Sequence, residues 1–173
     1  MFRALGTLVF AGLLFAPPQV RVQRLEGGAP TFDPFSTPSG IKAIVFLFTS
    51  TDCPISNRFA PEVRRLATAY APQGVLFRLV YVNPAEDATA IRDSKHALAK
   101  FVGATITPEA VVYAGGRVAY RGRIDDRYVD LGLERPAATT HDLAEALAAV
   151  LAGTPVPHPT TQAVGCYIAD LAR

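Results

Sequence analysis

The stretch AIVFLFTSTDCPIS, residues 43–56, places a cysteine and a proline beyond a continuous apolar run, with four residues in between. A short run of this kind, Ala43 to Phe48, is typical of a strand buried on both faces of a sheet. Pro54 has a fixed φ and no backbone N–H to lose, so it favours a helix that begins beside Cys53. The free N–H groups and the positive dipole end of that helix would favour a thiolate at Cys53, an effect that the neighbouring Asp52 opposes.

The sequence after the cysteine predicts an α/β fold with a central mixed sheet flanked by helices. Apolar residues recur every three or four positions from Ile55 to Tyr70, which predicts a helix. Alternating strands and helices imply parallel pairing, and a late hairpin adds antiparallel strands. The other predicted elements are a strand at 75–82, a helix capped by Asn83 and running to about Val102, a hairpin turning at Gly115–Gly116, and a helix capped by Thr139 with Asp142 and stopped by Gly153.

The composition is that of one globular domain. The chain has 173 residues, of which 50% are hydrophobic, and its formal net charge is +2. Its lysines and arginines are scattered, so nucleic acid is not an expected partner. The sequence has neither a G-x-x-x-x-G-K-[ST] phosphate loop nor a C-x-x-C-H haem motif. We expect no cofactor and no bound metal.

The two ends of the chain differ in composition from the predicted core. Residues 1–18 combine Arg3 with an apolar run that is shorter than the roughly 20 residues of a spanning helix. We expect a signal peptide or an N-terminal membrane anchor there, and a periplasmic or secreted protein. Residues 19–40 are rich in Pro, Gly and Ser and predict a linker with little regular structure. The folded domain is predicted at 41–153, and the tail at 154–173 carries the second cysteine, Cys166.

Three segments in order resemble the thioredoxin-like redoxins, the AhpC/TSA and thioredoxin families. FTSTDCPISNRFAPEVRRL resembles their active-site segment, TPEAVVYAGGRVAYRGRIDDRY resembles their later hairpin, and ALAAVLAGTPVPHPTTQAVGC resembles the last helix and Gly-Cys tail of one subgroup. The resemblance covers roughly Gly40 to Ile168 and implies a thioredoxin-like fold. It also implies that the bond between Thr107 and Pro108 corresponds to the cis-proline that sits against the reactive cysteine of these families.

The sequence departs from each family at the cysteine. Thioredoxins carry C-x-x-C, but Ser56 and Ser50 occupy the positions three after and three before Cys53. Peroxiredoxins resemble P-x-x-x-T-x-x-C, whereas Phe46 stands at the proline position and Ser50 at the threonine position. Copper-carrying relatives of the cytochrome oxidase assembly type use two close cysteines and a histidine. The only cysteine of this segment is Cys53.

Three functions are open at this level. In the first, Cys53 attacks the disulfide of a protein or small-thiol partner, and Cys166 resolves the mixed disulfide. In the second, a peroxide oxidises Cys53 to a sulfenic acid, with which Cys166 condenses. In the third, the fold binds a partner or Cu(I) through both sulfurs without catalysis.

The tail sequence suggests how the two cysteines meet. Its many Pro and Thr residues predict a mobile segment that carries Cys166 to Cys53, where an exchangeable bridge forms. The alternative is a structural bridge, which would close a loop of about 100 residues and stabilise the fold by roughly 4 to 5 kcal/mol.

The remaining polar residues are expected to be structural. His96 lies off the apolar stripe of its predicted helix and should be solvated, while His141 and His158 are expected to be incidental. The adjacent Asp125 and Asp126 are typical of turn and capping residues, held at the surface by the arginines that flank them.

Overall fold

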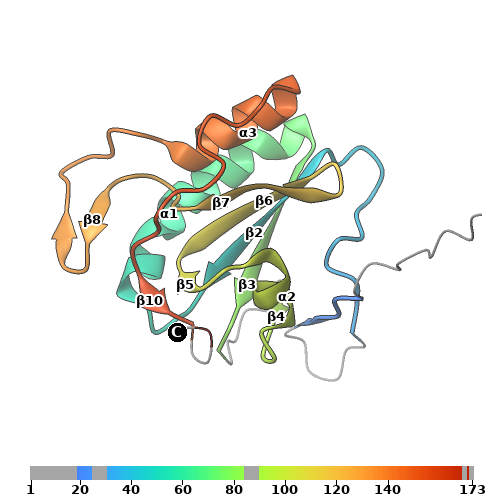
Figure 1. Ribbon diagram of the computed structural model, residues 1–173, viewed down its shortest axis with the longest axis horizontal. Helices are drawn as coiled ribbons and strands as arrows, with labels where there is room; N and C mark the ends of the chain where they lie inside the picture. The colour runs from blue at the N-terminus through green and yellow to red at the C-terminus, as the bar shows by residue number, and fades with distance from the viewer. Residues whose placement is uncertain (1–18, 25–30, 84–89, 169–170, 172–173) are drawn as a thin grey trace, which may run out of the picture.

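The computed structural model describes the chain except for residues 1–18, 25–30, 84–89, 169–170 and 172–173. The central sheet contains β1 (Gln23–Arg24), β2 (Ala43–Thr49), β3 (Val75–Tyr81), β4 (Ile91–Arg92), β6 (Glu109–Ala114) and β7 (Arg117–Gly122). Their order across the sheet is β1-β4-β3-β2-β6-β7 (Figure 1). The β2–β3 and β3–β4 pairs are parallel, and the β2–β6, β6–β7 and β1–β4 pairs are antiparallel. The prediction of a mixed sheet flanked by helices is confirmed.

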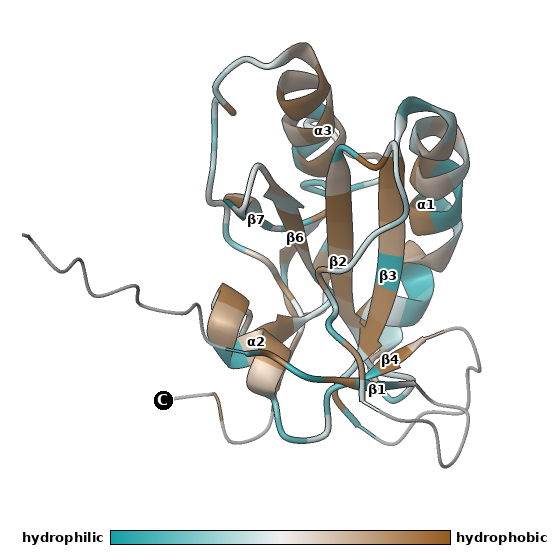
Figure 2. Cartoon of the chain, turned by 90° about the vertical axis from the view of Figure 1, so that its right-hand side faces the viewer, coloured by the Kyte–Doolittle hydropathy of each residue, from teal (hydrophilic) through white to brown (hydrophobic). Residues whose placement is uncertain are grey.

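Helices cover both faces of this sheet. They are α1 (Pro54–Tyr70), followed by a 3-10 turn η1 (Ala71–Gln73), α2 (Ala97–Val102) and α3 (Asp142–Ala152). Successive side chains of β2 point to opposite faces, so Val45 and Leu47 pack with α1 and α3, while Phe46 and Phe48 pack with α2. Figure 2 shows β2 as hydrophobic along its length, as expected for a strand buried on both faces.

Two small sheets lie outside the central one. β5 (Ile106–Thr107) pairs with β10 (Cys166–Tyr167), and β8 (Tyr128–Asp130) pairs with β9 (Leu133–Glu134). The β8–β9 hairpin projects beyond the central sheet (Figure 1). β10 lies beside the loop that leads into β6, which brings the end of the chain back to the start of α1.

The long helix predicted after Asn83 is wrong in its described part. The structure places β4 at Ile91–Arg92 and a separate short helix, α2. The reason is local, because the buried carboxylate of Asp93 accepts hydrogen bonds from the N–H groups of Leu98 (3.2 Å) and Ala99 (2.8 Å). These bonds start a new helix there. The predicted first turn falls within residues 84–89, outside the described part of the chain.

Two other expectations need correction. The lead-in at 19–40 contributes β1, and Val20 and Val22 are buried in the core, so this segment is part of the folded domain and not only a linker. Thr139 does not cap α3: His141 holds the N-cap position, and the N–H of Thr139 is bound to Asp126 (2.6 Å). The end of α3 at Gly153, with φ of 70°, is as predicted.

The tail is docked, which corrects the expectation of a mobile segment. Arg121 of β7 donates its N–H to Pro159 (3.0 Å) and accepts from Thr161 (3.1 Å). Further along, β10 pairs with β5, and Ile168 is buried in the core. Proline and threonine composition does not reveal these contacts because their partners lie in distant strands.

In the described part of the chain, no helix is both long and apolar enough to traverse a bilayer. The predicted signal or anchor at residues 1–18 lies outside the described residues.

Candidate active site

Cys53 lies between the end of β2 and the first turn of α1, as predicted. It is the N-cap residue of α1, and Pro54 occupies the first helical position. Its carbonyl accepts the N–H of Asn57 (3.2 Å), and its own N–H donates to the carbonyl of Ser50 (3.2 Å). The residue is only 1% exposed, so its sulfur sits beneath other groups of the protein.

The peptide bond between Thr107 and Pro108 is cis and lies against Cys53. The thiol of Cys53 donates a hydrogen bond to the carbonyl of Thr107, with 3.1 Å between sulfur and oxygen. Both Thr107 and Pro108 are buried. The conformation that the redoxin resemblance implied at this bond is therefore present.

Cys166 reaches the same place from the C-terminal tail. In the β10–β5 ladder it stands opposite Thr107, whose hydroxyl donates to the carbonyl of Cys166 (3.3 Å). The preceding residue must be small, since a Cβ on Gly165 would lie 2.1 Å from the carbonyl oxygen of Thr107. Cys166 is exposed, and both cysteines are free thiols. Thr107 thus contacts both cysteines.

The two thiols have opposite pKa shifts. Burial is the largest influence on Cys53 and raises its pKa, but hydrogen bonds from the Cys166 thiol and from the N–H and hydroxyl of Ser56 outweigh it and lower the pKa to about 7. The hydrogen bond that the Cys166 thiol donates to the sulfur of Cys53 is the main influence on Cys166, and it raises the pKa of Cys166 to about 11. Near neutral pH the pair therefore shares one proton, which Cys166 holds, and Cys53 is substantially a thiolate.

Ser56 is a site residue that the sequence analysis did not predict. It was noted only because it occupies the position of the second cysteine in the C-x-x-C motif. Its hydroxyl oxygen is buried, and no hydrogen-bond partner for it is found among the described residues. A buried hydroxyl without a partner is unfavourable, and the Cys53 thiolate supplies an acceptor for it. The residue three positions after the cysteine thus stabilises the thiolate form of Cys53.

We expect Ser56→Ala to raise the pKa of Cys53 by about one unit, because a hydrogen bond to a charged group contributes roughly 1.5 to 3 kcal/mol and one pKa unit is about 1.4 kcal/mol. Thermal stability should hardly change, because the hydroxyl has no other partner. Thiolate absorbance against pH measures the shift. Ser50→Ala is the matched control, since Ser50 bonds the N–H of Asp52 and the amide of Asn83. An equal shift in both variants would contradict the role of Ser56.

An open pocket of about 450 Å³ lies beside Cys166. Its walls come from the first turn of α1 and the β8–β9 hairpin, and are mainly apolar. Leu131 at the hairpin tip is 63% exposed, and Tyr167, next to Cys166, is 68% exposed. The lining residues are Pro54, Ile55, Arg58, Tyr128, Leu131, Gly132, Glu134 and Cys166.

Several solved structures have a similar fold. The model superposes on an uncharacterized conserved protein from Geobacillus kaustophilus with a TM-score of 0.72, at 24% identity over 87% of this chain and 88% of that one. A hypothetical protein from Sinorhizobium meliloti gives 0.70, at 24% identity over 86% and 89%. An uncharacterized thioredoxin-like protein from Porphyromonas gingivalis gives 0.52, at 16% identity over 82% and 93%. The chain has the thioredoxin-like fold. No protein-family model and no curated protein matches the sequence.

A buried carboxylate supports the cis-proline loop of this thioredoxin-like domain. Glu109 accepts the N–H groups of Thr105 (2.8 Å) and Ile106 (3.3 Å), and Arg121 lies 3.6 Å from its other oxygen. Burial raises the pKa of Glu109, while these donors and Arg121 act in the opposite direction. Glu109 fixes the loop that carries Thr107, a role that its sequence position inside a strand did not reveal.

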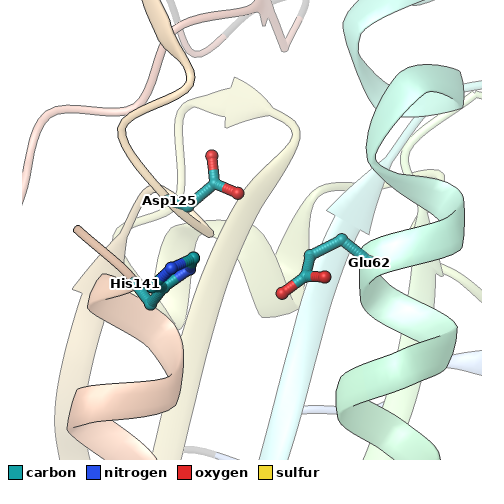
Figure 3. Close-up of side chains that lie close together, drawn as sticks. All are labelled: Glu62, Asp125 and His141. Carbon is teal, nitrogen blue, oxygen red and sulfur yellow. The ribbon is translucent and has the colours of Figure 1, made fainter. Parts of the chain in front are cut away.

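A second polar cluster joins Glu62, Asp125 and His141, which come from α1, the loop after β7 and the start of α3 (Figure 3). One ligand atom of each lies within 4.8 Å of the others. Both oxygens of Glu62 already accept from Arg65, at 2.8 and 2.6 Å. Burial raises the pKa of Asp125. Among the hydrogen bonds and ion pairs of the described residues, none links these three side chains, so the cluster gives the exposed His141 no role beyond the incidental one expected.

His96 and the aspartates after β7 are buried, contrary to their predicted surface positions. Asp125 and Asp126 are buried and accept backbone N–H groups, which fits the predicted capping role but not the surface position. Of the flanking arginines, Arg123 pairs with Asp142 at 2.8 Å and not with either of them. His96 is buried with φ of 53°, which corrects the expectation of a solvated residue.

Proposed function

We propose that this thioredoxin-like protein is a thiol–disulfide oxidoreductase whose redox pair is Cys53 and Cys166. The carrying observation is that Thr107 brings the two cysteines together, since its carbonyl accepts from the Cys53 thiol and its backbone pairs with Cys166; the pKa is about 7 on Cys53 and about 11 on Cys166. A thiolate available at neutral pH is the nucleophile that disulfide exchange requires. A second thiol in contact with it allows the pair to close into a disulfide within one chain.

The site residues act in distinct ways in this proposal. Cys53 is the nucleophile of the intramolecular step, and Cys166 is its sulfur partner. Thr107 and Pro108 position both cysteines: the Thr107 carbonyl accepts from Cys53 when this is protonated, and the Thr107 backbone pairs with Cys166. When the pair reduces a partner disulfide, two electrons pass from the two thiols to the partner, whose sulfurs take up the two protons.

The other two functions have less support from the geometry. The hydroxyl of Ser50, which could assist peroxide chemistry, bonds Asp52 and Asn83 and not Cys53. For a copper site, two sulfurs are a thin ligand set. Among the described residues, no His, Asp or Glu joins the two sulfurs in a ligand cluster.

The partner class follows from the pocket beside Cys166. Its apolar walls and the exposed Leu131 and Tyr167 suit a protein segment that carries an apolar side chain next to its cysteine. A small charged thiol would leave those walls uncovered. We therefore propose a protein thiol or disulfide as the partner.

The proposed function is tested by oxidising the protein with glutathione disulfide and mapping its disulfides by mass spectrometry. A Cys53–Cys166 bridge is expected, and it should oxidise a dithiol peptide with apolar flanking residues faster than a peptide with lysine flanks. Cys53→Ser should not turn over, which provides the control for thiol contaminants. Free cysteines after oxidation, or a bridge that no dithiol reduces, would refute the proposal.

Export is a separate proposal and rests on the sequence of residues 1–18. Residues 1–40 fused to a reporter that is active only outside the cytoplasm should give signal, and a fusion of residues 19–40 should not. A silent reporter with the longer fusion would remove the argument that the compartment favours disulfides.

A further inference from the structure

The two sulfurs of the proposed redox pair differ in access. Cys53 carries the low pKa but is 1% exposed. Cys166 is exposed and lines the apolar pocket. The thiol with the lower pKa is therefore not the one that is exposed to solvent.

The contacts of the tail hold β10 beside Thr107, whose carbonyl accepts from the Cys53 thiol. β10 is fixed to β5 on both sides of Cys166, because the residue before it, Gly165, lies against the Thr107 carbonyl and a residue after it, Ile168, is buried and donates its N–H to Thr105 (2.9 Å). To reach Cys53 directly, a partner would have to break this ladder and expose Ile168. Exchange at Cys166 requires neither change.

We propose that partner proteins exchange disulfides at Cys166, and that Cys53 acts behind it as the internal nucleophile and leaving group. This inference rests on the proposed oxidoreductase function and reverses the order of the two cysteines expected from the sequence. The tail stays docked during the exchange.

The exchange proceeds in two steps. A partner thiolate attacks the Cys166 sulfur of the Cys53–Cys166 disulfide, a partner–Cys166 disulfide forms, and the electron pair of the broken bond leaves on Cys53 as a thiolate. A second thiolate of the partner then attacks the partner's own sulfur, which forms the partner disulfide and releases Cys166, and Cys166 takes up a proton. The partner dithiol is oxidised by two electrons, and the protein disulfide is reduced by two.

The chemistry of the leaving group agrees with this order. In disulfide exchange the sulfur with the lower pKa leaves faster. Attack at Cys166 expels Cys53, whose thiolate accepts hydrogen bonds from the N–H and hydroxyl of Ser56, whereas attack at Cys53 would expel Cys166, whose surroundings offer no comparable donor among the described residues. Access and leaving-group ability thus favour the same sulfur of the bridge.

The test uses the oxidised full-length protein and a monothiol peptide with apolar flanking residues. The reaction is quenched in acid after a short time, free thiols are alkylated, and the two cysteines are mapped by mass spectrometry. We expect the peptide on Cys166 and the alkyl group on Cys53. Peptide mainly on Cys53 would overturn the inference while leaving the redox pair intact, whereas failure to form the bridge at all would refute the proposed function.

A variant of the tail tests the cover itself. Gly165→Ala places a Cβ against the Thr107 carbonyl and should release β10. For the reduced variant, we expect faster alkylation of Cys53, and for any oxidised fraction a shift of the peptide toward Cys53. Gln162→Ala, at an exposed tail position, is the control and should behave as wild type. Unchanged alkylation of Cys53 in a folded Gly165→Ala protein would show that β10 does not cover it.

Discussion

Cys166→Ala is expected to raise the pKa of Cys53 from about 7 by about one to two units, because a hydrogen bond to a charged group contributes roughly 1.5 to 3 kcal/mol. The thiolate fraction at pH 7 should then fall by about fivefold to fiftyfold, since burial continues to raise the pKa of Cys53. Turnover of dithiol peptides should be lost, because no second sulfur remains. The rate of iodoacetamide alkylation against pH gives the new pKa.

Cys166→Ser separates the two roles of Cys166. Its hydroxyl can still donate to the Cys53 sulfur, so the pKa of Cys53 should stay near the wild-type value of about 7, while turnover is lost as in Cys166→Ala. A pKa that rises equally in both variants would indicate that docking of the tail, and not the donated hydrogen bond, sets the acidity of Cys53. An unshifted pKa in both would exclude Cys166 as its cause.

Asp126→Ala is expected to have the largest effect on stability. Asp126 accepts the N–H groups of Thr139 (2.6 Å) and Thr140 (2.9 Å) and the hydroxyl of Thr139, and it pairs with Arg135 (3.2 Å). These bonds join the two ends of the segment that contains the β8–β9 hairpin, and this hairpin forms one wall of the pocket. We expect a loss of about 3 kcal/mol, because hydrogen bonds to charged groups contribute roughly 1.5 to 3 kcal/mol each and do not add fully when they share one carboxylate.

The melting temperature should fall by about 6 to 12 °C, at roughly 2 to 4 °C per kcal/mol for a chain of this size. Asp130→Ala is the control, because that exposed carboxylate accepts only the N–H of Leu131 among the contacts found in the described chain. Equal melting temperatures for the two variants would contradict the anchoring role of Asp126.

The contribution of Asp126 should also depend on pH. Burial raises its pKa, but the threonine donors and Arg135 outweigh this and hold the pKa well below its usual range. A carboxyl with a lowered folded-state pKa stabilises the fold above its unfolded pKa of about 3.9, and this stabilisation is lost as the pH falls toward the folded value. The difference in melting temperature between wild type and Asp126→Ala should therefore be full at pH 7 and shrink below about pH 4.

The junction of β2 and α1 was predictable because its signals are local. A continuous apolar run defines the buried strand, and Pro54 marks the helix start, so the position of Cys53 follows from its neighbours in sequence. The long helix after Asn83 was wrong for the converse reason. The spacing of its apolar residues is compatible with one helix. The carboxylate of Asp93, however, accepts the backbone N–H groups five and six residues ahead, and the spacing of apolar residues gives no sign of these hydrogen bonds.

The meeting of Cys53 and Cys166 could not be derived from the sequence in physical terms. It depends on the pairing of two strands of two residues each, too short to show periodicity, and on a glycine chosen for close approach to the Thr107 backbone. The order of exposure was equally hidden. In the structure Cys53 is buried and Cys166, on the docked tail, is exposed, whereas the sequence had suggested an accessible Cys53.

The docked tail also protects an edge of the central sheet. β7 is the last strand on its side, and residues 159–161 run along it in parallel, occupying the N–H and carbonyl of Arg121. Unpaired groups on an edge strand are a template on which another molecule can add a strand. A chain that ends before Pro159 would therefore lose Cys166 and would also expose β7 as an unpaired edge strand. We expect such a chain to self-associate as well as to lose redox activity.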